Sequence, residues 1–259
     1  MGEFFGFGGY QRQPEGYMSW QHLVFVSSLL TIMAVLAVVF GIRSRDKSLA
    51  RRDRAIVIAA IAIDTIEIIK ILAMCLRAKD PMGWTTELPL FLCSIQLITL
   101  PLAAFSKGRV QEAALDFVCI FGLLGAVLGT VGAGQNYNCY PVLSLDNVAS
   151  GLTHCISGFA SLYLMISKKA QLKKENMVIT FGILVAFCIM AFTANVILDY
   201  NYMFLVRGDG TPYDILYNLV GGNQIIYPIC VVGLFLVYIS AFYGICFRIR
   251  KKMQTPANV

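Results

Sequence analysis

Residues 23–54 read LVFVSSLLTIMAVLAVVFGIRSRDKSLARRDR, an apolar run of about twenty residues followed by a break that carries six Lys and Arg. An apolar run of that length can cross the hydrocarbon core of a bilayer as one helix. The same alternation continues along the chain and predicts seven spans, over residues 20–42, 55–76, 87–105, 111–131, 148–167, 177–199 and 223–247. The fold class we expect is an all-α polytopic membrane protein with seven transmembrane helices.

Composition agrees with a membrane protein. The 259 residues are 58% hydrophobic and only 14% charged, with a mean hydropathy of +0.69. Soluble domains are about 45–50% apolar and about 25% charged. The net charge of +6 does not indicate nucleic-acid binding, because the basic residues flank apolar runs and are not interleaved with exposed aromatic residues.

The basic residues also predict an orientation. Sixteen of the 21 Lys and Arg fall in the breaks after the first, third, fifth and seventh spans. By the positive-inside rule these breaks are cytoplasmic and the N-terminus is outside. The expected organisation is an extracytoplasmic segment (1–19), a seven-helix transmembrane domain (20–247) and a basic cytoplasmic tail (248–259).

The eight cysteines lie mostly within apolar runs and have no CxxC or other ligand-type spacing. The sequence therefore predicts no metal site and no cofactor. Cys75 and Cys139, near the outer ends of spans, are the two cysteines that could pair, and two free thiols are the favoured alternative. The Gly125-Ala-Val-Leu-Gly129 run has the GxxxG spacing typical of close helix packing.

Ionisable residues at membrane depth are costly and therefore informative. Most of them fall in the outer half of the predicted bundle. Cys93 lies about six residues, or about 9 Å, inside the third span, and His154 lies at a similar depth in the fifth. A thiolate is a good nucleophile and a neighbouring imidazole can take its proton, so Cys93 and His154 are a candidate nucleophile and base. The polar residues that accompany them are His22, Glu67, Lys70, Gln96 and Asn195.

Each of these residues also has a structural interpretation. A cysteine in an apolar span is commonly a small core residue, and an intramembrane histidine can simply bond a neighbouring helix. Glu67 and Lys70, at i, i+3 spacing, favour a structural ion pair. Asp64 fits either a cation site or a buried protonated carboxyl. Hydroxyls such as that of Ser157 usually bond the carbonyl one turn back.

Several motifs in order resemble the YwaF family of integral membrane proteins. They are Leu88-Pro89-Leu90-Phe91-Leu92-Cys93, Leu100-Pro101-Leu102, His154, and Asn195 followed by Asn201-Tyr202-Met203-Phe204-Leu205, together with His22, Glu67 and Lys70. This bacterial-type family is similar to the transmembrane-protein-164-type acyltransferases. One position departs from it, because Phe91 stands where the family pattern has histidine.

The resemblance implies a lipid acyltransferase of a bacterial plasma membrane. Cys93 would accept a fatty acyl chain from one phospholipid, and His154 would activate the hydroxyl that receives it. Headgroups would rest near Asn201, Tyr202 and Arg207, and the expected partner is a membrane phospholipid. The clustering of polar residues in the outer half also suggests an outward-facing cavity. The alternative function is a transporter or receptor that uses this cavity, with Glu67, Lys70 and Asp199 recognising a ligand or proton.

Overall fold

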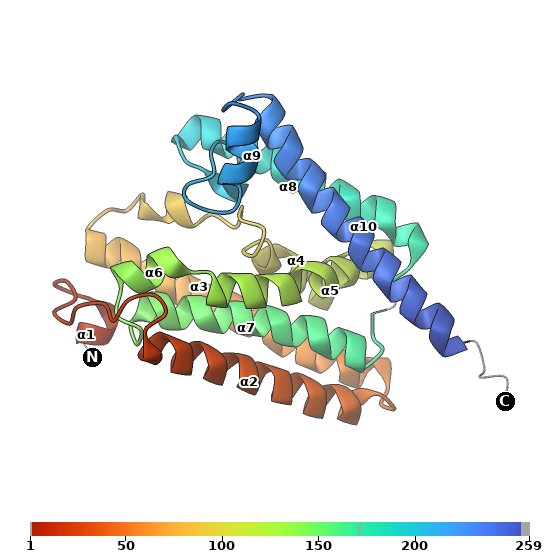
Figure 1. The fold of residues 1–259 in the computed structure, drawn as a ribbon. Helices are drawn as coiled ribbons and strands as arrows, with labels where there is room; N and C mark the ends of the chain where they lie inside the picture. Colours follow the sequence, from red (N-terminus) through yellow and green to blue (C-terminus); the bar gives the residue numbers. More distant parts are fainter. Residues whose placement is uncertain (1, 171, 255–259) are drawn as a thin grey trace. The chain divides into compact units, whose positions relative to one another are not determined.

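The computed structural model describes residues 2–170 and 172–254, and the chain divides at residue 171 into two compact units (Figure 1). The described residues form helices and connecting loops, without strands. The last five residues of the expected cytoplasmic tail, 255–259, lie outside the described part. Each unit is treated on its own below.

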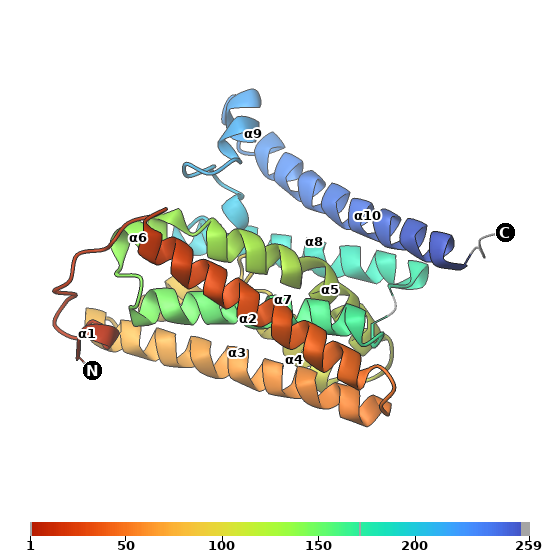
Figure 2. The same cartoon turned by 60° about the horizontal axis from the view of Figure 1, so that its bottom comes forward.

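The first unit is built around α7. Its helices are α1 (Gly2–Phe5), α2 (Trp20–Ser44), α3 (Leu49–Ala78), the 3-10 helix η1 (Gly83–Glu87), α4 (Gln96–Phe105), α5 (Gly108–Val131), α6 (Gly134–Cys139) and α7 (Leu145–Ile166). Helix α7 packs against α2, α3 and α5, while α4 packs against α3 and α5 (Figures 1 and 2). The core of this unit therefore lies on the faces of α7 and α5.

Small residues let α5 and α7 approach closely. A Cβ built on Gly122 would lie 2.5 Å from the carbonyl oxygen of Ser157, a distance that real Cβ atoms do not reach. The Ser161 hydroxyl donates to the Cys119 carbonyl across the same interface at 2.7 Å. Inside a membrane the hydrophobic effect does not drive helices together. Helices there are expected to associate through close backbone packing and interhelical hydrogen bonds.

Basic loops meet at one end of the first unit. The Arg45 guanidinium donates to the Ile166 carbonyl at 3.2 Å, and that of Arg52 donates to the Ser167 carbonyl at 3.1 Å. Lys169 pairs with Asp53 at the same end. The breaks that follow α2 and α7 thus lie together, as the expected shared side of the membrane requires.

The opposite end is held by Arg77 and Asp146. Arg77 donates two hydrogen bonds to the Asp146 carboxylate, both 2.7 Å long, and lies over the rings of Tyr10 and Tyr140. Burial and the neighbouring Asp146 carboxylate raise the pKa of Tyr10 to about 12. The Tyr10 hydroxyl therefore stays protonated and donates to Asp146. This network fixes the N-terminal segment on the bundle.

The second unit contains α8 (Lys174–Leu198), the 3-10 helix η2 (Tyr202–Phe204), α9 (Asp214–Leu219) and α10 (Ile226–Gln254). Helix α10 continues seven residues beyond the boundary expected at 247. Met203 and Phe204 adopt φ angles of 54° and 56°, in the left-handed region that bulky residues rarely occupy. The loop before α9 therefore carries local backbone strain.

Within the described residues, five helical stretches are long and apolar enough to cross a membrane: α2, α5 continuing into α6, α7, α8 and α10. The 30-residue α3 is also long, but Asp64, Glu67 and Lys70 interrupt its apolar surface. The number of seven spans and the orientation of the termini remain predictions.

The third expected span is not a continuous helix. Glu87 ends η1, residues 88–91 are irregular, residues 92–95 form a turn, and only Gln96–Phe105 is α-helical. Pro89 accounts for the break, because a proline has no backbone N–H and disfavours helical geometry in the residue before it. The expectation of one helix over 87–105 was wrong, since it counted apolar residues without giving this proline its weight.

Candidate functional site

Cys93 lies in the turn that precedes α4. The Phe91 carbonyl accepts a hydrogen bond from the Ile95 N–H at 3.0 Å, and the Ser94 hydroxyl caps the Phe91 N–H at 3.0 Å. These bonds close a tight turn around the cysteine. Cys93 is a free thiol, and the residue as a whole is partly exposed.

His154 lies in the third turn of α7 and reaches this cysteine. Its side chain lies close enough to that of Cys93 for the thiol and the imidazole to interact. Its ring nitrogen Nδ1 lies 2.7 Å from the Ser150 carbonyl oxygen. Because a carbonyl can only accept, Nδ1 carries the proton of the neutral ring. Nε2 is then left with its lone pair, which is the form able to accept a proton from a thiol.

Two glycines of α5 make the room that this pair occupies. A Cβ built on Gly125 would lie 3.4 Å from the Cβ of Cys93, and one on Gly129 would lie 2.1 Å from both Nε2 and Cδ2 of His154. The GxxxG spacing places the two glycines one turn apart on one helix face. They were expected to serve helix packing, and in the structure they face Cys93 and His154.

A buried charge cluster lies beside the pair. Lys70 Nζ is 2.7 Å from Glu67 Oε1 and 2.8 Å from Glu87 Oε2. The ion pair expected between Glu67 and Lys70 is therefore confirmed, and Glu87 is a second partner. The Lys70 ammonium also interacts electrostatically with His154. The cluster is thus electrically coupled to the proposed base.

Gln96 and His22 are fully buried. The Gln96 side-chain oxygen accepts from Thr99 at 3.3 Å, while its Nε2 has no protein partner. His22 Nδ1 accepts from the Met18 N–H at 3.2 Å, and its ring packs 4.1 Å from that of Tyr137. His22 thus joins α2 to α6, whereas Gln96 lies one turn beyond Cys93.

The hydroxyls next to His154 bond their own helix. Ser157 donates to the Thr153 carbonyl and Thr153 to the Ser150 carbonyl, both at 3.0 Å. The expected bond from Ser157 to the carbonyl one turn back is confirmed. These two hydroxyls are therefore occupied, while the Cys93 thiol faces the imidazole.

The remaining predicted residues organise a loop of the second unit. Asn195 accepts from the Tyr202 N–H at 2.5 Å and donates to the Tyr202 carbonyl at 3.0 Å. The Asn201 amide donates to the Arg207 carbonyl and to Asp209, both at 2.8 Å, and accepts from the Val206 N–H at 2.9 Å. Within that unit, both asparagines act as scaffolds for residues 200–209.

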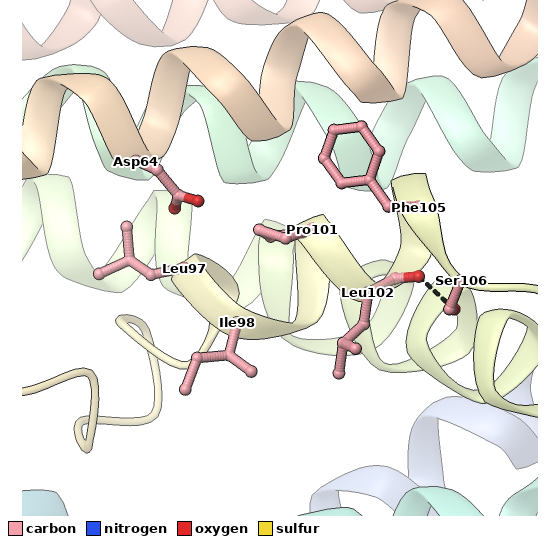
Figure 3. Close-up of a pocket in the computed structure, with 7 residues that line it drawn as sticks. All are labelled: Asp64, Leu97, Ile98, Pro101, Leu102, Phe105 and Ser106. Carbon is pink, nitrogen blue, oxygen red and sulfur yellow. Dashed lines mark hydrogen bonds between the residues drawn. The ribbon is translucent and has the colours of Figure 1, made fainter.

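A groove of about 530 Å³ lies between α3 and α4 (Figure 3). Apart from Asp64 and Ser106, its lining is apolar, and it consists of Leu97, Ile98, Pro101, Leu102 and Phe105. The Asp64 carboxyl faces this groove, and one of its oxygens has no protein partner. Both interpretations of Asp64, a cation site or a protonated carboxyl, stay open.

Two residues of the site were missed from the sequence. Glu87 was interpreted as the polar first residue of the third span. It stands immediately before Leu88-Pro89, and a proline disfavours helical geometry in the residue before it, so this position indicated a break in the helix. Ser150 contributes its carbonyl, which any residue supplies, and its hydroxyl lies 3.5 Å from the same ring nitrogen, Nδ1 of His154. Its place four residues before His154 on a helix was the available signal.

Comparison with known proteins identifies one family. The model of the TMEM164 family matches residues 17–243, which include every helix from α2 to most of α10. No curated protein matches the chain, and no solved structure matches it. The match covers both Cys93 and His154.

Proposed function

The chain belongs to the TMEM164 family of membrane proteins, and from this premise we propose that it is an integral membrane acyltransferase that moves a fatty acyl chain between phospholipids. The observation that supports the proposal is the proximity of Cys93 and His154 beside Gly125 and Gly129 of α5, with Nδ1 of the imidazole held on the Ser150 carbonyl. This is the arrangement of an activated nucleophile, in which an orienting group fixes the base and the base faces the thiol.

The first half reaction forms a thioester. The Cys93 thiol gives its proton to Nε2 of His154, and the thiolate attacks the ester carbonyl of a donor phospholipid. The carbonyl carbon gains a C–S bond and loses its C–O bond. The leaving alkoxide of the lysolipid takes the proton from the imidazolium, which regenerates the neutral base.

The second half reaction transfers the chain. His154 takes the proton of an acceptor hydroxyl, whose oxygen attacks the thioester carbonyl. The new C–O bond forms as the C–S bond breaks, and the released thiolate recovers the proton from the imidazolium. Water in place of the acceptor would make the protein a hydrolase. No metal or cofactor enters either half reaction.

The proposal includes a location in the membrane. With seven spans and the N-terminus outside, the Cys93–His154 pair lies in the outer half of a bacterial plasma membrane. The charge bias of the sequence supports this orientation, as does the clustering of Arg45, Arg52 and Lys169 at one end of the first unit.

The test compares turnover and lipid binding in matched variants. Purified protein is incubated with a donor phospholipid and a lysolipid, and the product is measured by mass spectrometry. Cys93→Ser should abolish transfer, and His154→Ala should reduce it by about 10²- to 10⁴-fold, the usual contribution of general base catalysis. Both variants should still bind lipid. Full transfer by Cys93→Ser would refute the proposal and favour the transporter or receptor alternative.

A further inference from the structure

The Lys70–Glu87 ion pair lies where the chain leaves regular structure. Glu87 is the last residue of η1, and Lys70 lies near the outer end of α3. The pair is 2.8 Å long, and the Lys70 side chain is only 14% exposed. Glu67 holds the other side of the same ammonium at 2.7 Å. The lysine is therefore fixed by α3 itself and presents a rigid cation to Glu87.

The segment that follows Glu87 carries Cys93 and is not helical. Its backbone hydrogen bonds are local, from the Leu90 N–H to the Leu88 carbonyl at 2.7 Å and from the Ile95 N–H to the Phe91 carbonyl at 3.0 Å. Such bonds shape a turn but do not attach it to α3. At its two ends η1 and α4 pack against α3, and the Lys70–Glu87 ion pair fixes the last residue of η1 to that helix.

We propose that the Lys70–Glu87 ion pair positions the Cys93 segment, so that the thiol meets His154 only while the segment is tied to α3. This inference rests on the proposed acyl transfer and deepens it. Lys70 and Glu87 are positioning residues: they act on the reaction through the place of Cys93 and do not exchange a proton or an acyl group themselves.

The surroundings of the pair fit this role. Three elements converge on the site: α3 brings Lys70, the segment before α4 brings Cys93, and α7 brings His154. Helix α7 packs directly on α3, so a tie between α3 and the segment also sets the segment against α7. The Lys70 side chain is 14% exposed and that of Glu87 is 30% exposed, so the pair is partly shielded and loses less strength to solvent than one on an open surface.

Glu87→Gln is the primary test, because it removes the charge while keeping the shape of the side chain. The alkylation rate of Cys93 by iodoacetamide is measured at neutral pH by peptide mass spectrometry, in parallel with thioester formation from a phospholipid. Loss of the tie should slow Cys93 alkylation by about tenfold, equivalent to about 1.4 kcal/mol. The maximal rate of thioester formation should fall by the same factor, with an unchanged Michaelis constant for lipid.

Asp53→Asn is the matched control. Asp53 forms the ion pair with Lys169 that ties α3 to the loop after α7, at the other end of the same unit. Its loss removes an inter-element pair of the same kind without touching the Cys93 segment. Cys93 alkylation and thioester formation should both keep their wild-type rates.

A charge exchange guards against a variant that merely fails to fold. In the double variant Lys70→Glu/Glu87→Lys, the lysine introduced at position 87 faces Glu67 and the new carboxylate at position 70, which keeps the net charge of the cluster. Lys70→Glu alone should lose Cys93 reactivity, and the double variant should regain at least part of it. Recovery would show that the ion pair between positions 70 and 87 is needed, because a general effect of one charge change would not be reversed by the other.

Three results would overturn the inference. They are wild-type alkylation in Glu87→Gln, no recovery in the charge exchange, and a raised Michaelis constant with an unchanged maximal rate, which would make Lys70 a lipid-binding cation. The alkylation assay needs no acyl transfer, so the two proposals can fail separately. A wild-type protein that forms no thioester but whose Cys93 responds to Glu87→Gln would retain the positioning role and lose the proposed reaction.

Discussion

Gly129→Ala should disable the proposed base without altering any polar group. A Cβ at this position would lie 2.1 Å from Nε2 and Cδ2 of His154, whereas ordinary contact begins at 3.4 Å. The imidazole must therefore retreat by about 1.3 Å. It is also held by the bond from Nδ1 to the Ser150 carbonyl at 2.7 Å, so a retreat strains or breaks that bond.

The magnitude follows from the displacement. A misplacement of about 1 Å in a catalytic group can cost about 10²-fold in rate. We therefore expect Gly129→Ala to slow thioester formation by about 10²-fold, equivalent to about 2.7 kcal/mol in the activation free energy. The assay is single-turnover formation of a hydroxylamine-sensitive adduct from a phospholipid with a tagged acyl chain.

Two alanine substitutions serve as controls. At Gly125 the new Cβ would meet Cys93 Cβ at 3.4 Å, which is ordinary contact, so the rate should fall much less. Gly182, on α8, has nothing within 4 Å of its ideal Cβ, and its substitution should leave the rate unchanged. Equal rates for Gly129→Ala and Gly182→Ala would refute the reasoning, because His154 would then not need the space that Gly129 leaves.

Three further substitutions test other parts of the account. Phe91→His introduces the histidine expected here from the YwaF resemblance and should raise the rate of thioester formation several-fold, whereas an unchanged or lower rate would mean that this position does not act on Cys93. Asn195→Ala removes both side-chain partners of the buried Tyr202 backbone, so the free energy of unfolding should fall by about 2 kcal/mol, seen as a lower melting temperature in detergent. Arg77→Lys loses the two-bond contact with Asp146 and should lower the melting temperature by a similar free energy, and an unchanged value would remove the role of that contact.

Some of the fold followed from the sequence because bilayer thickness imposes a length on apolar runs. Helices α2, α5, α7, α8 and α10 lie where the apolar windows placed them. The apolar window at residues 87–105 did not correspond to one helix, because a run of apolar residues can be long enough for a span and still be interrupted by a proline. Pro89 ends the regular structure, and the turn it permits is what carries Cys93.

The pairing of Cys93 with His154 was proposed from the sequence on the basis of equal depth in two helical spans. That argument assumed a helix from residue 87 to Cys93, and residues 88–95 are not helical. Depth in the membrane also does not tell how a helix is rotated about its axis. The sequence therefore did not reveal that Gly129 faces the imidazole of His154. Nor did it indicate Glu87, whose role depends on the direction of a segment that was expected to be helical.

The function of the loop residues was the least accessible part. Asn195 and Asn201 were chosen as polar residues near a membrane surface, and their side chains are used to hold the backbone of residues 200–209. A side-chain amide looks the same in a sequence whether it binds a headgroup or caps a turn. The amide distances inside the loop distinguish these uses, and the sequence does not contain them.

Direct detection of the acyl-enzyme tests the central claim most simply. Wild type, Cys93→Ser, His154→Ala and the control Cys75→Ser are incubated with a phospholipid that carries a tagged acyl chain, and the labelled residue is identified by mass spectrometry before and after hydroxylamine. The account predicts a hydroxylamine-sensitive label on Cys93 in the wild type and in Cys75→Ser, little in His154→Ala and none in Cys93→Ser. An acyl label that persists in Cys93→Ser, or wild-type protein that turns over lipid without ever carrying one on Cys93, would contradict it.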